Sequence, residues 1–177
     1  MNETVKNLIS RRSIKCYNKK SVPKELLDKI LEAGTYAPTG KNMQSPIIIA
    51  ITDPQIRDKV SRMNAAVLGT GSDPFYGAPI VLVVLADRRI GTYIYDGSLV
   101  MGNLMNAAHS LGVSSCWIHR AREVFDSDEG KDILRSVGLS DEEVENYEGI
   151  GNCVLGYTDA PFPTTRPRKD KYIYYIE

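Results

Sequence analysis

The sequence contains few cysteines and no long hydrophobic run. Its three cysteines, Cys16, Cys116 and Cys153, are too few and odd in number for a disulfide framework, so we expect a reducing, cytoplasmic compartment. The longest apolar stretches, around residues 46–51 and 78–86, are far shorter than the about 20 residues of a membrane-spanning helix. The first residues carry early charges and no apolar segment, so no secretory signal is expected.

The sequence also lacks an excess of charge of either sign. It has 22 Lys and Arg against 22 Asp and Glu, so its formal net charge is zero. This balance argues against a nucleic-acid partner and against a basic membrane-surface protein. With 177 residues, 42% of them hydrophobic and 25% charged, the composition is typical of one globular domain and not of a collagenous, disordered or disulfide-rich chain.

Hydrophobic periodicity predicts both helices and strands. Apolar residues recur at helical spacing in the stretches 4–10, 23–34, 54–67 and 96–111. Short apolar runs with β-branched residues predict strands at 47–52, 80–86, 113–118 and 152–157. Ser140 and Glu143 form an S-x-x-E capping box, which predicts the start of a short helix. The alternation of strands and helices, taken alone, favours a parallel α/β sheet.

Two basic clusters stand near opposite ends of the chain. The first, residues 11–15, places three cations and a hydroxyl directly after the first predicted helix, and the second consists of Arg166, Arg168 and Lys169. Guanidinium and ammonium groups form charge-assisted hydrogen bonds to phosphate oxygens, so the two clusters could converge on one anion. The alternatives are a solvated basic stretch at a helix end and a solvated tail.

Other local signals are weaker. The loop 37–46 offers an amide, a hydroxyl and backbone N–H groups to a planar heterocycle, or is an ordinary surface connection. Neither a dinucleotide-binding glycine fingerprint nor a phosphate-binding loop motif is present. Cys116 and His119 have C-x-x-H spacing, but no second pair completes a zinc site, so no metal is expected. A structural Cys116 is favoured, and a Cys–His nucleophilic pair stays open without a recognisable oxyanion hole.

Taken together and in order, these segments resemble the FMN-dependent nitroreductase family. The resemblance covers nearly the whole chain, and its specificity comes from the order and spacing of motifs that are individually loose. In chain order the motifs are Arg11-Arg12-Ser13-Ile14-Lys15-x-Tyr17, Val22-Pro23-x-Glu25-x-Leu27, Ile30-Leu31-Glu32-Ala33-Gly34, Ala37-Pro38-Thr39-Gly40-x-Asn42-x-Gln44, Phe75-Tyr76-Gly77-Ala78-Pro79, Leu111-Gly112-Val113, Ser115-Cys116-Trp117-Ile118, and Gly156-Tyr157 with Arg168-Lys169.

The resemblance implies an α+β fold, with a mostly antiparallel sheet between helices in place of the parallel sheet. It implies a single domain over residues 1–177 that assembles as an intertwined homodimer, with FMN bound at the dimer interface. The helix 96–111 would lie at that interface. The C-terminal tail, about residues 160–177, would be exchanged with the partner subunit and pair with its sheet, which would cover the strand-forming residues 172–176.

The resemblance also assigns cofactor-binding residues. Those that match the segment for the FMN phosphate and ribityl chain are Arg11, Arg12, Ser13 and Lys15, joined from the C-terminal cluster by Arg168, Arg166 and Lys169. Those that match the loop against the isoalloxazine, from the other subunit, are Pro38, Thr39, Gly40 and Asn42. Those that match the strand end at the reactive edge of the ring are Trp117, Ile118 and His119. Asn64 matches a side-chain amide on the pyrimidine edge.

The function that this resemblance implies is electron transfer through FMN. NADH or NADPH would reduce the flavin, which would pass electrons to a small acceptor such as a nitroaromatic or a quinone, in a ping-pong mechanism. No side chain would act as a catalytic nucleophile, because the flavin carries the chemistry. Lys15 and Arg12 would supply positive charge that stabilises the reduced flavin. The alternatives are an FMN-binding redox sensor or flavin store without turnover, and an oxidoreductase with a specialised acceptor.

Overall fold

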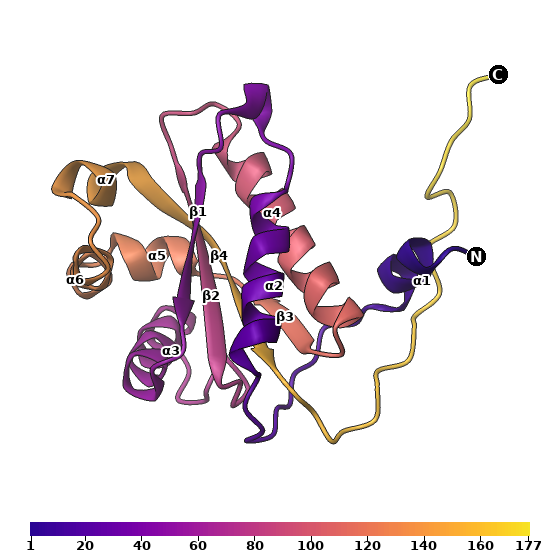
Figure 1. Ribbon diagram of the computed structural model, residues 1–177, viewed down its shortest axis with the longest axis horizontal. Helices are drawn as coiled ribbons and strands as arrows, with labels where there is room; N and C mark the ends of the chain where they lie inside the picture. Colours follow the sequence, from indigo (N-terminus) through magenta and orange to yellow (C-terminus); the bar gives the residue numbers. More distant parts are fainter.

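A computed structural model describes residues 1–177 as a four-stranded sheet with helices on both faces (Figure 1). The strands are β1 (Pro46–Ile51), β2 (Ile80–Asp87), β3 (Ser114–Ile118) and β4 (Tyr147–Gly156), in the order β1-β2-β4-β3. The helices are α1 (Glu3–Ser10), α2 (Lys24–Thr35), the short 3-10 helix η1 (Gly40–Asn42), α3 (Pro54–Leu68), α4 (Tyr93–Ser110), α5 (Ala121–Asp126), α6 (Asp128–Ser136) and α7 (Asp141–Asn146).

Every pair of neighbouring strands is antiparallel, so the expectation of a parallel sheet from alternation is wrong and the antiparallel sheet that the resemblance implies is confirmed. The pairing of Ile51 with Val81 explains the difference. It places the end of β1 beside the start of β2, although α3 intervenes in the sequence. The loop after α3, residues 69–79, therefore brings the chain back to the end from which α3 departed, which a parallel crossover would not do.

The two faces of the sheet form two separate cores. Helices α2 and α4 cover one face, and α3, α5, α6 and α7 lie on the other (Figure 1). The central strand β2 is buried on both faces, because Val81, Val83 and Leu85 point into one core while the alternate residues point into the other. Such a continuous apolar run is expected where both faces of a strand are covered.

Local sequence signals set most element boundaries. Asp53 caps α3 by accepting hydrogen bonds from the backbone N–H groups of Gln55 and Ile56, at 2.8 and 2.9 Å. The capping box predicted at Ser140 forms at the start of α7. Strand β4 begins at Tyr147, five residues before the predicted strand, because its first half contains glycines that obscure the strand pattern. Gly149 is needed there, since a Cβ would lie 2.4 Å from the backbone of Ala121.

The loop between α3 and β2 is organised by one carboxylate. Asp73 accepts hydrogen bonds from Ser61 Oγ (2.5 Å) and Arg57 Nη2 (2.6 Å), and from the backbone N–H groups of Phe75 (2.9 Å) and Gly77 (2.8 Å). Partial burial alone would raise the pKa of Asp73, but these four donors together hold the pKa below its usual value. The ionised carboxylate therefore stabilises the loop.

The two edges of the sheet differ. The segment after α1 covers the outer edge of β3, where Ser13 forms a parallel bridge with Ser115 and the Ile14 N–H donates to the Ser115 carbonyl at 3.0 Å. The outer edge of β1 has no such neighbour. Helix α1 lies beside the end of α4, away from the sheet, and the irregular chain after β4 passes close to it (Figure 1).

No helix is long and apolar enough to cross a membrane.

Candidate functional site

The two basic clusters meet in one cavity. Its volume is about 820 Å³, and we call it the basic pocket. The last turn of α1 with the segment after it forms one wall, and the C-terminal tail forms the other, although they lie at opposite ends of the sequence. The residues that line it are Leu8, Ile9, Arg11, Arg12, Ser13, Thr165, Arg166, Pro167 and Arg168. The arrangement therefore brings together the segments that the sequence suggested could converge on one anion.

The charge of the basic pocket is uncompensated. No carboxylate lines it, and none of its four arginines forms an ion pair. Arg12 Nη1 donates to the carbonyls of Ile9 and Arg11, both at 2.7 Å, which fixes its guanidinium. Two further nitrogens, Arg11 Nη1 and Arg12 Nε, are buried without a hydrogen-bond partner. Unpaired buried donors on charged groups are costly, and an anion with several acceptor oxygens would satisfy them.

The bridge between Ser13 and Ser115 joins the basic pocket to strand β3. The two segments run in the same direction at this bridge, and β3 continues from Ser115 for three residues to Ile118. At about 3.3 Å per residue, the strand end lies about 10 Å further along. Lys15 lies outside the basic pocket, and its Nζ is 5.9 Å from the ring centroid of Tyr76. A ligand held at the pocket could extend along β3.

The end of β3 presents one indole and one imidazole. Trp117 packs on β4 at Gly151, where a Cβ would lie 2.7 Å from the indole Nε1. That Nε1 is buried and has no hydrogen-bond partner. The exposed ring of His119 lies 6.0 Å from the Trp117 ring, whereas Ile118 points into the core. At this strand end His119 therefore presents exposed polar atoms, whereas the polar atom of Trp117 is buried.

Two asparagines bond to the backbone at the end of β3, and an arginine bonds to one of them. We call these three residues the amide clamp: Asn64, Arg120 and Asn152. Asn64 Nδ2 donates to the His119 carbonyl at 2.8 Å, and Asn64 Oδ1 accepts from Arg120 Nε at 3.0 Å. Asn152 Nδ2 lies 3.4 and 3.3 Å from the carbonyls of Ile118 and His119. Arg120 has a φ of 72°, a left-handed conformation that a side chain disfavours.

This placement changes the interpretation of Asn64. Its side chain was expected to meet the flavin, but Asn64 is fully buried and its amide bonds to protein atoms at both ends. The amide cannot contact a ligand in this conformation, so its role here is to fix the strand end. Sequence reasoning missed Arg120, because the residue type of an arginine does not indicate that its φ is positive. It also missed Asn152, although a polar residue inside the apolar run of β4 is a usable signal.

The loop 38–42 is built on the other end of α4. The Gly40 N–H donates to Asp96 Oδ1 at 3.0 Å, and Thr92 Oγ1 donates to Asp96 Oδ2 at 2.9 Å. Gly40 is needed there, since a Cβ would lie 2.4 Å from Thr92 Oγ1. At about 1.5 Å per residue, Asp96 is about 20 Å along α4 from His109. His109 contacts Ser10, the residue directly before Arg11 of the basic pocket. Within one chain, Pro38, Thr39, Gly40 and Asn42 are therefore not brought to the basic pocket.

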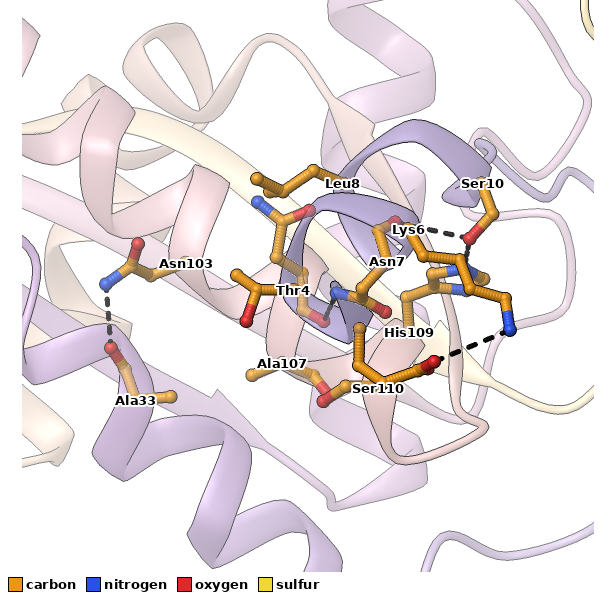
Figure 2. Close-up of a pocket in the computed structure, with 12 residues that line it drawn as sticks. Thr4, Lys6, Asn7, Leu8, Ser10, Ala33, Asn103, Ala107, His109 and Ser110 are labelled. Atoms are coloured by element: carbon orange, nitrogen blue, oxygen red, sulfur yellow. Dashed lines mark hydrogen bonds and ion pairs between the residues drawn. The ribbon is translucent and has the colours of Figure 1, made fainter. Parts of the chain in front are cut away.

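A second cavity, of about 650 Å³, lies between α1 and α4 (Figure 2). Across it, Asn7 Nδ2 donates to the Asn106 carbonyl at 2.9 Å, and Ser10 Oγ lies 2.8 Å from His109 Nε2. The ring of Phe162, from the tail, stacks on His109 with 5.8 Å between centroids. Burial, followed by the charges of Arg11 and Arg12, lowers the pKa of His109. These effects favour the neutral imidazole.

The remaining nucleophile candidate is buried. The Cys116 thiol donates to the Trp117 carbonyl at 3.6 Å, and burial raises its pKa, against the smaller opposing effects of Ser13, Lys15 and Arg11. A buried thiol with a raised pKa is a poor nucleophile. No group of three or more His, Cys, Asp or Glu side chains is arranged to hold a metal ion.

Three comparisons with known proteins bear on this site. The sequence profile of the Nitroreductase family matches residues 8–74. A protein of Archaeoglobus fulgidus, named as a candidate NADH dehydrogenase/NAD(P)H nitroreductase, is 32% identical over 123 residues, which cover 67% of this chain and 68% of that protein. A protein of Methanothermobacter thermautotrophicus with the same name is 29% identical over 117 residues, 61% of this chain, and the match spans only 56% of its length.

The fold also matches a solved structure over its whole length. A crystal structure of a nitroreductase with bound FMN from Bacteroides fragilis superposes with a TM-score of 0.89 and 26% sequence identity, covering 100% of both chains. The superposition thus covers this chain from the first helix to the C-terminal tail.

Proposed function

The chain belongs to the nitroreductase family, and from this we propose that it is an FMN-dependent NAD(P)H oxidoreductase. The observation that carries the proposal is the basic pocket, where four arginines from the two ends of the chain meet without a carboxylate. FMN is a planar ring system that ends in a phosphate, and a site for it needs an anion cradle at one end and a flat contact surface at the other. The bridge between Ser13 and Ser115 joins the segment of the basic pocket to β3, and this connection supports the proposal.

The residues of the basic pocket fit the phosphate of FMN. Two buried guanidinium nitrogens, one on Arg11 and one on Arg12, lack a partner, and the phosphate supplies three strong acceptor oxygens. Guanidinium groups suit this task because their donors form a planar fork. The five residues that would hold the phosphate are Arg11, Arg12, Ser13, Arg166 and Arg168.

The ring would lie toward the end of β3. Trp117 and His119 stand there, the amide clamp keeps the backbone rigid, and Lys15 adds a positive charge beside Tyr76. A cation held near the ring would stabilise the negative charge that the flavin gains when it is reduced. We assign this role to Lys15, with Arg12 as the second candidate. The loop of Pro38, Thr39, Gly40 and Asn42 would reach the ring from a second copy of the chain.

FMN, when bound, would accept a hydride from NADH or NADPH and deliver electrons to a small acceptor such as a nitroaromatic or a quinone. The chain's own residues bind the phosphate, orient the ring and leave one face open for the two substrates in turn, as a ping-pong mechanism requires. No side chain is needed as a nucleophile, and the buried Cys116, whose pKa is raised, is unsuited to that role.

A homodimer completes the proposal. Large apolar side chains on α1 and α4 are exposed in the single chain, namely Val5, Leu8, Ile9, Ile94, Tyr95 and Leu99. Exposed groups of apolar residues such as these two, which lie toward opposite ends of α4, are typical of an interface. In the tail, Phe162 and Arg166–Arg168 contact their own chain, whereas residues 172–176 are exposed. We propose that these last residues pair with the free edge of the partner's β1.

The test is a spectroscopic titration of the purified protein. We expect about one FMN retained per chain, with the two-band flavin spectrum, and rapid bleaching of that spectrum when NADH or NADPH is mixed in under anaerobic conditions. A protein that takes up no FMN would overturn the proposal. A bound flavin that neither nucleotide reduces would indicate an FMN-binding sensor or store instead.

A further inference from the structure

One histidine contacts both segments that carry the arginines of the basic pocket, at residues beside those that line it. His109, in the last turn of α4, contacts Ser10 from α1 and Phe162 from the tail. We propose that His109 is a positioning residue that holds the two arginine-bearing segments together and so assembles the phosphate site. This inference rests on the proposed binding of FMN. His109 itself does not line the basic pocket.

The first contact fixes Arg11 and Arg12. Helix α1 buries none of its residues, so apolar packing does not anchor it within the chain. Polar bonds to α4 hold it instead: Ser10 Oγ lies 2.8 Å from His109 Nε2, and Asn7 Nδ2 donates to the Asn106 carbonyl (Figure 2). Ser10 directly precedes Arg11, so the bond to His109 acts at the point where the helix ends and the basic segment begins.

The second contact fixes Arg166 and Arg168. After β4 the tail has no regular structure, and it is tied first by Asn18, whose Nδ2 donates to Asp159 Oδ1 at 2.9 Å. The stack of Phe162 on His109 is the next attachment, with centroids 5.8 Å apart and planes inclined by 28°. Four residues of chain reach at most about 14 Å, so the position of Phe162 limits where Arg166 can lie.

The physical benefit is preorganisation. Without the His109 contacts, the tail would sample many conformations, and binding a phosphate would require ordering it, which opposes binding. With them, the four guanidinium groups already surround one cavity. Burial, followed by the charges of Arg11 and Arg12, lowers the pKa of His109, and this suits the position because a charged ring would be repelled by the two guanidinium groups.

The test compares FMN with riboflavin, which has the same ring but no phosphate. We expect His109→Ala to weaken FMN binding about ten-fold, through loss of the stack and the Ser10 bond, and to leave riboflavin affinity unchanged. Phe162→Ala, which removes only the stack, should weaken FMN binding by a smaller factor. Ser110→Ala is the matched control, because its hydroxyl bonds only to the Ala107 carbonyl of its own helix, and it should change neither affinity.

A second readout needs no flavin. In the apoprotein, His109→Ala and Phe162→Ala should both accelerate tryptic cleavage after Arg168, since the tail is released, while Ser110→Ala should not. The inference would be overturned if the variants lost FMN and riboflavin affinity equally. It would also be overturned if FMN affinity stayed unchanged, or if the cleavage rate stayed unchanged. If His109→Ala does not fold, the exposed Phe162→Ala variant decides the question. A wild-type protein that binds no FMN would overturn the proposed function, and the cleavage rates would still judge the role of His109.

Discussion

Replacement of Asn64 by leucine tests whether the amide clamp fixes the end of β3. Leucine has the same branched arrangement of side-chain heavy atoms as asparagine, so the substitution removes hydrogen bonds without opening a cavity. The His119 carbonyl would keep only the longer contact to Asn152 Nδ2, at 3.3 Å, and Arg120 Nε would lose its acceptor at 3.0 Å. A buried carbonyl left poorly paired costs about 1–3 kcal/mol, and the half-exposed guanidinium about 1 kcal/mol. We expect a loss of about 2–4 kcal/mol.

Urea denaturation followed by circular dichroism measures this loss. Arg120→Gly serves as the companion variant, because glycine adopts the φ of 72° freely and gains about 1 kcal/mol while losing the bond to Asn64. Its unfolding free energy should therefore fall by about 0–2 kcal/mol, less than that of Asn64→Leu. The reasoning is refuted if Asn64→Leu is as stable as the wild type, or if Arg120→Gly is destabilised as strongly as Asn64→Leu.

Three further predictions concern other parts of the chain. Asp73→Asn should lower the unfolding free energy by about 2 kcal/mol at pH 7, whereas Asp58→Asn, on an exposed carboxylate, should lower it by less than about 0.5 kcal/mol. Because the folded pKa of Asp73 is lowered, its stabilisation is present above about pH 4 and is lost as the pH falls further; a urea series across pH in which the wild type and Asp73→Asn do not converge at low pH would contradict this. Gly40→Ala should destabilise the loop by about 1–3 kcal/mol through its clash with Thr92, as thermal melts would record, and an unchanged melting temperature would refute it. Truncation after Lys169 should shift the mass in light scattering from that of a dimer toward that of one truncated chain, slightly below the full-length 19.7 kDa, and a dimer of unchanged stability would exclude the exchanged tail.

Local signals in the sequence were enough for most elements of the fold. The caps at Asp53 and Ser140 mark the starts of α3 and α7, and the apolar run of β2 identifies the central strand. The pairing of the strands was not accessible in this way, because alternation says nothing of where a loop such as 69–79 returns the chain. The antiparallel sheet came from the resemblance and not from the periodicity.

The candidate site divides in the same manner. The basic residues of both pocket walls were found from sequence, because clustered cations without nearby carboxylates have few structural uses. The supporting residues were not. Arg120 is distinguished only by its backbone conformation, and His109 only by contacts with Ser10 and Phe162, which are remote in sequence. Such roles depend on long-range geometry that residue type does not encode.

The most direct test of the central claim is a calorimetric comparison of FMN and riboflavin binding to the wild-type protein and to Arg11→Ala. If the basic pocket holds the phosphate, FMN should bind at least about 100-fold more tightly than riboflavin, since several charge-assisted hydrogen bonds go to the phosphate. Arg11→Ala should remove most of that difference while leaving riboflavin affinity intact. Equal affinities of the wild-type protein for the two flavins, or no binding of FMN, would contradict the phosphate site and with it the proposed function.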